Sequence, residues 1–122
     1  MIGDEILVYI GTYTRGKSEG IYVYRLDRST GVLRHQSTAV GVENPSFLAL
    51  TPDNRHLYAV NSVKEYEGTQ GGAVSAFAVA PAKGDLSFLN TKPTYGANPC
   101  HLVVDATGRF VLVANYTGGS LT

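Results

Sequence analysis

The residue best suited to chemistry in this 122-residue chain is His101, which ends the sequence Asn98-Pro99-Cys100-His101. An imidazole changes its charge near neutral pH, so this side chain could act as a general base or a general acid. It could equally be bound to a backbone carbonyl or simply be exposed, and the sequence leaves these interpretations open. We take His101 as the candidate catalytic residue.

Further polar and aromatic residues are candidates for binding a ligand near His101. Arg15, with Lys17 close by, could bind a phosphate, although a solvated loop is the usual setting for such charges. Tyrosine rings could wall a sugar-sized ligand or pack between elements with a wet hydroxyl. Asparagines that end predicted strands could face a ligand or cap a loop. The candidate substrate-binding residues are Asn115, Tyr116, Tyr13, Arg15 and Asn61.

Other motifs have simpler explanations. Asn44 and Asn98 each precede a proline and are best explained as turn residues at the entry to a strand. Cys100 has no evident base beside it, which argues against a nucleophile. The sequence contains no zinc-type Cys/His spacing, EF-hand loop, Walker A motif or glycine-rich dinucleotide fingerprint. It therefore supports neither a metal site nor a cofactor.

An internal repeat determines the elements that must position these residues. Residues 44–61 align without a gap on residues 98–115, at a constant offset of 54 positions. Both segments share their terminal asparagines, the proline, one leucine and one arginine. Residues 20–38 repeat less closely in the segment that ends at Thr91. Each copy is an apolar run, a turn and a second apolar run, with Asn54 and Gly108 where a left-handed backbone is tolerated.

The copies combine into four-stranded units whose spacing is typical of propeller blades. One full unit is expected, with three strands before it and two after it, and no segment has a helical period. The predicted fold is therefore all-β, a β-propeller of four-stranded antiparallel blades. A single β-sandwich is the alternative, but it would not explain the constant offset. The expected strands cover residues 5–11, 20–26, 32–38, 47–51, 55–61, 73–79, 85–90, 101–105 and 109–115.

We expect an incomplete propeller domain, an N-terminal fragment. It comprises a partial blade without its innermost strand (1–40), a full blade (44–92) and the start of a third (98–122), whose next strand is expected to be missing after the last glycines. Such a chain exposes strand edges and a bare blade face. The remaining blades of the same propeller, or self-association, would cover them.

Blade geometry also sorts the loops. The connections into each first strand, and those between each second and third strand, lie at one end of the blades, and the candidate site residues all fall there. We call this the ligand end. The remaining turns, such as Pro52-Asp53-Asn54, lie at the opposite end.

Composition excludes several classes of protein. Ten basic and ten acidic residues give no net charge, so a nucleic-acid partner is not expected. No apolar stretch approaches the ~20 residues that span a bilayer, so no membrane association is expected. Acids stand near the N-terminus where a signal peptide needs basic residues, and the single cysteine suits a reducing compartment. We expect a cytoplasmic protein.

Several motifs resemble the lactonase family of seven-bladed propellers, which includes propeller-type 6-phosphogluconolactonases and carboxy-cis,cis-muconate cyclases. They are Tyr9-Ile10-Gly11-Thr12-Tyr13-Thr14, Gly20-Ile21-Tyr22, Asn44-Pro45-Ser46, Asn98-Pro99-Cys100-His101 and Ala114-Asn115-Tyr116. The resemblance implies hydrolysis of a sugar δ-lactone, above all 6-phosphogluconolactone to 6-phosphogluconate in the pentose phosphate pathway, without a metal. It also implies His101 as base or polarising group, with Asn115 and Tyr116 as substrate contacts.

The resemblance leaves two alternatives open for a full-length protein, and it does not decide whether the 122 residues are an enzyme alone. One alternative is a muconate-type lactonising cyclase. The other is a propeller that serves as a binding scaffold without catalysis, because function lies in sites grafted on folds.

Overall fold

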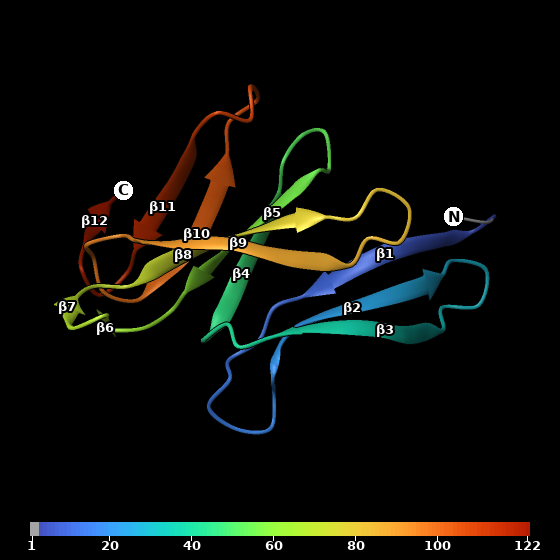
Figure 1. Ribbon diagram of the computed structural model, residues 1–122, viewed down its shortest axis with the longest axis horizontal. Coiled ribbons are helices and arrows are strands. Elements are labelled where there is room, and N and C mark those ends of the chain that lie inside the picture. Colours follow the sequence, from blue (N-terminus) through green and yellow to red (C-terminus); the bar gives the residue numbers. More distant parts are fainter. Residues whose placement is uncertain (1–2) are drawn as a thin grey trace.

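The computed structural model describes residues 3–122, and over this range all regular structure is β. Three sheets follow one another across the molecule in chain order (Figure 1). The first sheet contains β1 (Glu5–Ile10), β2 (Gly20–Asp27) and β3 (Leu33–Val40). The second contains β4 (Pro45–Leu50), β5 (His56–Asn61), β8 (Ala73–Val79) and β9 (Leu86–Pro93). The third contains β10 (Pro99–Val104), β11 (Val111–Asn115) and β12 (Ser120–Leu121). A small hairpin, β6 (Glu65–Tyr66) and β7 (Thr69–Gln70), lies between β5 and β8.

Strands that are consecutive in a sheet pair antiparallel, and the second sheet has the four-stranded order β4-β5-β8-β9. The prediction of an all-β chain built from antiparallel four-stranded units is confirmed. Asn54 and Gly108 have φ values of 59° and 73°, so both turns use the left-handed conformation that the sequence suggested.

Two local expectations were wrong or incomplete. A next strand does begin after the last glycines, because Gly119 donates a backbone hydrogen bond to the Asn115 carbonyl (2.9 Å) and turns the chain back. Ser120 then pairs with Asn115 in β12. The β6–β7 hairpin was not predicted from the sequence. Its turn places Glu67 and Gly68 at φ values of 50° and 75°, as a tight two-residue hairpin requires.

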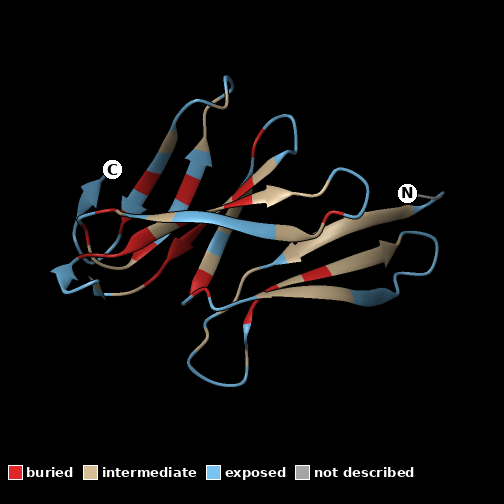
Figure 2. Ribbon diagram, in the orientation of Figure 1, coloured by how far each residue is buried: buried red, intermediate tan, exposed pale blue. Residues whose placement is uncertain are grey.

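The second sheet is packed on both faces, because its strands alternate. In β5, Leu57 and Ala59 join a cluster with Ile21, between the first and second sheets. The intervening Tyr58 and Val60 face the other way and join a cluster between the second and third sheets. Burial of both faces explains why the inner strands are apolar at consecutive positions. Figure 2 shows buried segments along the strands in the middle of the molecule and the tips of most turns exposed.

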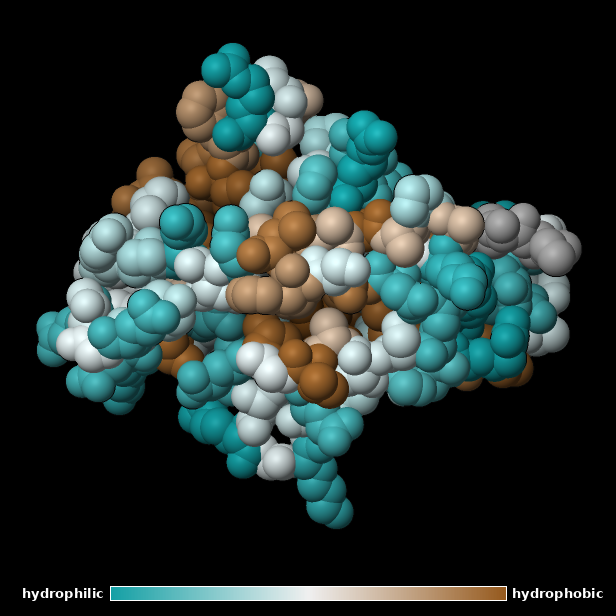
Figure 3. All heavy atoms as spheres, viewed as in Figure 1, coloured by the Kyte–Doolittle hydropathy of each residue, from teal (hydrophilic) through white to brown (hydrophobic). Residues whose placement is uncertain are grey.

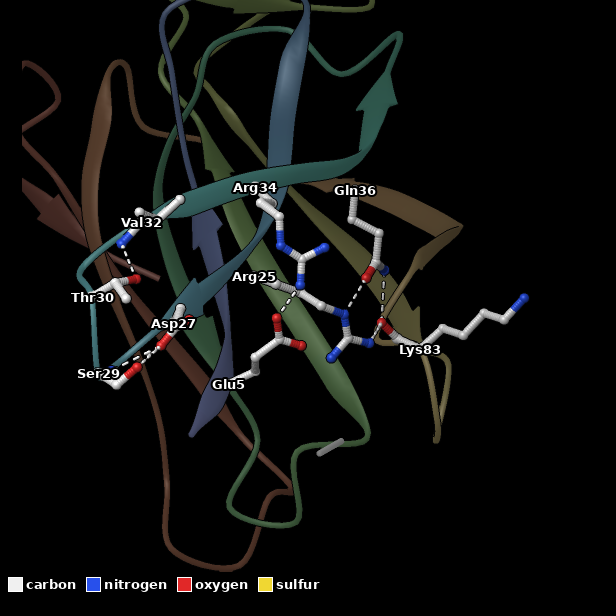
Figure 4. A network of polar contacts seen from close by, with 9 residues as sticks. All are labelled: Glu5, Arg25, Asp27, Ser29, Thr30, Val32, Arg34, Gln36 and Lys83. Atoms are coloured by element: carbon white, nitrogen blue, oxygen red, sulfur yellow. Dashed lines mark hydrogen bonds and ion pairs between the residues drawn. The ribbon is translucent and has the colours of Figure 1, made fainter. Parts of the chain in front are cut away.

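A polar network joins the first sheet to the turn between β8 and β9 (Figure 4). Arg25 donates to the Gln36 side chain (2.7 Å), and both side chains donate to the Lys83 carbonyl, at 3.3 and 2.7 Å respectively. Tyr9 donates its hydroxyl hydrogen to the neighbouring Gly84 carbonyl (2.7 Å). These contacts hold the turn of one sheet against the strands of the sheet before it.

The third sheet leaves apolar side chains uncovered. Val103, Phe110, Leu112 and Leu121 are all exposed. Figure 3 shows hydrophobic atoms gathered over β10 and β11, in the upper left of the view. This surface resembles the face of a propeller blade that packs on an adjacent blade.

Candidate functional site

The loops of the ligand end line an open cleft of about 470 Å³. It is built from the connection after β1, the two connections into β4 and β10, and the connection after β5. Its lining residues are Arg15, Glu43, Asn44, Ser62, Val63, Lys64, Glu65 and Asn98. A second hollow of about 340 Å³ lies among the opposite turns, including Pro52 and Gly108. The two ends of the blades thus collect the loops that the antiparallel geometry predicts.

Asn44 and Asn98 both line this cleft, at equivalent places in the repeat. Both have left-handed backbones, with φ values of 43° and 51°. The proline that follows normally favours an extended conformation at the preceding residue, so this is a departure from the expected backbone. Asparagine tolerates it better than other non-glycine residues. Both residues are turn residues, as predicted, although of the left-handed kind.

Arg15 is the predicted binding residue that lies in the cleft itself. Its guanidinium carbon is 5.1 Å from the centre of the Tyr13 ring, a cation–π contact. Tyr13 is 52% exposed, so its ring remains accessible to a ligand. The structure therefore brings two of the predicted residues together on one loop of the ligand end.

His101 lies on the inner strand β10, close to its start at the cleft. The pairing of β10 with β11 is irregular between Pro99 and His101, and both Cys100 and His101 are exposed. Such a bulge breaks the strict alternation of a strand and re-aims a side chain. The His101 ring packs against the ring of Phe47 on β4, with centres 4.4 Å apart. His101 is thus exposed beside the neighbouring inner strand, rather than in the cleft lining.

The two predicted asparagines at the strand ends are buried, Asn61 being 5% and Asn115 2% exposed. Asn61 accepts a hydrogen bond from the Ser75 hydroxyl (2.7 Å) and donates one to the Glu43 carbonyl (2.7 Å). Asn115 donates to the hydroxyls of Ser120 and Thr122. Their amides join strands to loops, and the structure does not bring them to the cleft surface.

Tyr116 follows Asn115 directly, and its backbone N–H donates to the Asn98 carbonyl (3.0 Å). Its side chain is 81% exposed, with no ring contact to the other candidates. The structure therefore places Tyr116 at the rim of the ligand end, where its ring is free to meet a ligand.

The sequence interpretation missed several residues of the cleft. Ser62 donates to the Pro99 carbonyl (2.5 Å) and so ties the second sheet to the third. Lys64 and Glu65 approach from the base of the β6–β7 hairpin and line the cleft. The only sequence signal for this hairpin is the Glu67-Gly68 pair at its turn, which is weaker than the usual Asn-Gly.

Residues 3–122 hold neither a metal-binding cluster nor a membrane-spanning helix. No group of three or more histidine, cysteine, aspartate or glutamate side chains could hold a metal ion there. Cys100 is a free, exposed thiol. Within the same residues, no helix has the length and apolar character required to cross a membrane.

The repeated antiparallel sheets, packed face to face with their connections gathered at one end, define a propeller. Residues 7–122 match the sequence profile of the family described as "Lactonase, 7-bladed beta-propeller". The chain belongs to this family.

Individual relatives agree with this assignment. The chain is 41% identical, over 113 residues, to the 6-phosphogluconolactonase of Bacillus subtilis, covering 93% of this chain and 31% of the relative. It superposes with a TM-score of 0.88 and 42% identity on a Bacteroides fragilis protein assigned as a 6-phosphogluconolactonase, covering 98% of this chain and 32% of that one. The periplasmic gluconolactonase of Pseudomonas aeruginosa superposes with a TM-score of 0.80 and 32% identity, covering 90% of this chain and 31% of that one. The chain spans about a third of the length of these relatives.

Proposed function

We propose that this chain supplies one third of a seven-bladed propeller that hydrolyses a sugar lactone, namely 6-phosphogluconolactone to 6-phosphogluconate. The observation that carries the proposal is the 41% identity to the Bacillus subtilis 6-phosphogluconolactonase over 93% of the chain. The cleft at the ligand end supports it, because Arg15 and Lys64 both line it.

His101 is proposed as the general base. It takes a proton from a water molecule as the water oxygen attacks the lactone carbonyl carbon. The tetrahedral intermediate then breaks the ring C–O bond, and the imidazolium returns the proton to the leaving oxygen. The products are a carboxylic acid and a free hydroxyl, so the step balances without a cofactor. The exposure of His101 and its place on the inner strand support this role.

Arg15 is proposed to bind the phosphate of the substrate. A guanidinium can donate two parallel hydrogen bonds to phosphate oxygens. The position of Arg15 in the cleft and the stacking of its guanidinium on Tyr13 support this role. The exposed rings of Tyr13 and Tyr116 are proposed as apolar walls for the sugar.

A second candidate substrate is unphosphorylated gluconolactone. The similarity to the Pseudomonas aeruginosa gluconolactonase favours it. The reaction would be the same, but Arg15 would then have no anionic group to bind. An Arg15→Ala variant therefore distinguishes the two substrates, because its KM should rise for the phosphorylated lactone and stay the same for gluconolactone.

The deciding experiment is a hydrolysis assay of the full-length protein with each lactone, after subtraction of spontaneous hydrolysis. We expect turnover that prefers the phosphorylated lactone, and a rise in KM for this substrate in Arg15→Ala. Equal rates on both lactones would favour gluconolactone. No rate above background with either would contradict the proposal and favour a lactonising cyclase or a non-catalytic scaffold.

We propose that the protein works in the cytoplasm as part of the pentose phosphate pathway. The presence of a single cysteine, which is free and exposed, supports a reducing compartment. Fractionation of cells that express a tagged full-length protein tests this location. Recovery in a periplasmic or secreted fraction would contradict it.

A further inference from the structure

We propose that Asn44 is a positioning residue that holds the Arg15 loop in place at the ligand end. The inference rests on the proposed function in one respect, because it takes Arg15 as the group that binds the substrate. Asn44 is only 5% exposed, so its own side chain is available for internal contacts rather than for a ligand.

Asn44 contacts two connections at once. Its Oδ1 accepts hydrogen bonds from the backbone N–H (2.8 Å) and the hydroxyl (3.2 Å) of Thr14. Its own N–H donates to the Thr14 hydroxyl oxygen (3.0 Å). On the other side, its Nδ2 donates to the Ser62 carbonyl (3.1 Å), while its carbonyl accepts from the Ser62 N–H (3.1 Å). Asn44 therefore joins the connection after β1 to the end of β5.

The equivalent residue of the next repeat shows which of these contacts are special. The Asn98 N–H donates to the Val63 carbonyl (2.9 Å) in the preceding sheet's connection, and its carbonyl accepts from Tyr116 (3.0 Å). Its side chain, however, donates to the Thr117 hydroxyl (2.8 Å) of its own sheet. The backbone hydrogen bond to the asparagine carbonyl is thus repeated, from Ser62 in one case and Tyr116 in the other. The side-chain bonds to the preceding sheet are found at Asn44 and not at Asn98.

These bonds fix the residue next to Arg15. Thr14 is held by its backbone and its hydroxyl, and Thr12 donates to the Pro45 carbonyl (3.0 Å) from the same loop. Arg15 therefore belongs to a loop that is fixed on the second sheet, and its guanidinium is stacked on Tyr13. A pre-positioned cation loses less conformational freedom when it binds an anionic group.

Limited trypsin digestion of the full-length protein tests the positioning directly. Trypsin cleaves after Arg15 and Lys17, both of which lie in the loop. Asn44→Gly removes the side chain and keeps a residue that accepts positive φ. We expect this variant to be cleaved about tenfold faster at these bonds, because the rate follows the open population of the loop. Cleavage after Arg28 and Arg109 serves as the internal reference.

Asn98→Gly is the matched control, because it makes the same change at the equivalent backbone position. We expect it to leave cleavage after Arg15 within about twofold of the wild-type rate, since its side chain does not reach this loop. Thr14→Val should reproduce part of the Asn44→Gly effect, and Thr14→Ser, which keeps the hydroxyl, should restore the wild-type rate. Equal cleavage after Arg15 in Asn44→Gly and Asn98→Gly would overturn the proposal.

Kinetics of the full-length protein separate this inference from the proposed function. We expect Asn44→Gly to raise KM for the phosphorylated lactone about tenfold with kcat within about twofold, and to leave KM for the unphosphorylated lactone unchanged. A wild-type protein without lactonase activity would overturn the proposed function, while the digestion result would still decide the role of Asn44. A fall in kcat on both lactones without a change in KM would contradict positioning of Arg15.

Discussion

His101 and Phe47 occupy equivalent positions on adjacent inner strands, and their rings touch at a centre distance of 4.4 Å. The repeat therefore has an apolar ring in one sheet and an ionisable ring of similar shape in the next. The contact with Phe47 holds the imidazole without using its nitrogen atoms. A histidine placed in this way is available for proton transfer at the proposed site.

Replacing His101 with phenylalanine restores the repeat and removes the proposed base. We expect kcat of the full-length protein to fall by about 10²- to 10⁴-fold, the usual contribution of a general base. The melting temperature should change little, because the new ring can still pack on Phe47. The measurements are steady-state hydrolysis and thermal unfolding of the same preparation. Unchanged turnover would remove His101 from the mechanism.

At the scale of elements, the turn between β8 and β9 packs on the first sheet, whereas the turn between β2 and β3 has open space around its glycine. Both contain a glycine with φ of 78°, Gly84 in the first case and Gly31 in the second. A Cβ at Gly84 would lie 2.3 Å from a methyl carbon of Leu7 and 2.9 Å from the Tyr9 hydroxyl oxygen. A Cβ at Gly31 would meet nothing within 4 Å.

The pair Gly84→Ala and Gly31→Ala separates backbone strain from crowding between sheets. Both variants pay for a left-handed alanine, about 1–2 kcal/mol of unfolding free energy. Gly84→Ala should lose about 1–3 kcal/mol more, because Leu7 and Tyr9 must shift. Urea denaturation of each variant measures the difference. Equal losses would show that the turn can move away from the first sheet without cost.

We expect the same turn to make the junction of the two sheets sensitive to acid. Hydrogen bonds from Ser37 and from Gln36, both 2.7 Å long, lower the pKa of the Asp85 carboxyl group below its usual value. A group with a lowered folded-state pKa stabilises the fold above its unfolded pKa of about 3.9, and loses that contribution as the pH falls through the folded value.

We therefore expect the free energy of unfolding to decrease as the pH drops below about 4. Asp85→Asn should weaken this dependence of stability on pH. Denaturant unfolding between neutral pH and pH 3 measures it. Asp53→Asn should also reduce the dependence, because the Thr51 hydroxyl lowers the pKa of Asp53, but it does so within a single turn and not between sheets. Equal pH profiles for the wild type and Asp85→Asn would contradict a role for Asp85 at the junction.

At the scale of the whole molecule, the packed sheets end on surfaces that have no partner among residues 3–122. The face of the third sheet is apolar and exposed, and the outer strand β9 exposes Phe88 and Leu89. Apolar patches and free strand edges of this kind favour association. In the proposed propeller, further blades cover the third sheet.

The 122-residue chain on its own is expected to self-associate. Light scattering after size-exclusion chromatography should give a mass above that of the monomer and rising with concentration. Phe110→Ser and Leu112→Ser, on the exposed face of the third sheet, should reduce it. Val113→Ser is not a suitable control, because Val113 is buried in the core. A monodisperse monomer that unfolds cooperatively would contradict this prediction.

The sequence by itself determined the architecture, because the relevant signals are local and repeated. Alternating apolar residues, turn residues such as Asn54 and Gly108, and the constant offset between copies each restrict a short segment. Together they predicted nine of the strands to within a few residues, although not the β6–β7 hairpin or β12, and the end of the blades where the candidate loops meet.

Only the tertiary structure decided which polar residues are available at that end. Asn61 and Asn115 resemble ligand contacts in the sequence, yet their partners come from other strands and loops, and both are buried. His101 is exposed next to an irregular pairing that depends on the neighbouring strand. The cleft that holds Arg15 needs connections from three sheets, including a hairpin with a weak sequence signal. Apart from the Asn115 bonds to the nearby Ser120 and Thr122, these features arise from contacts between segments distant in the chain, so the pattern of any single segment does not contain them.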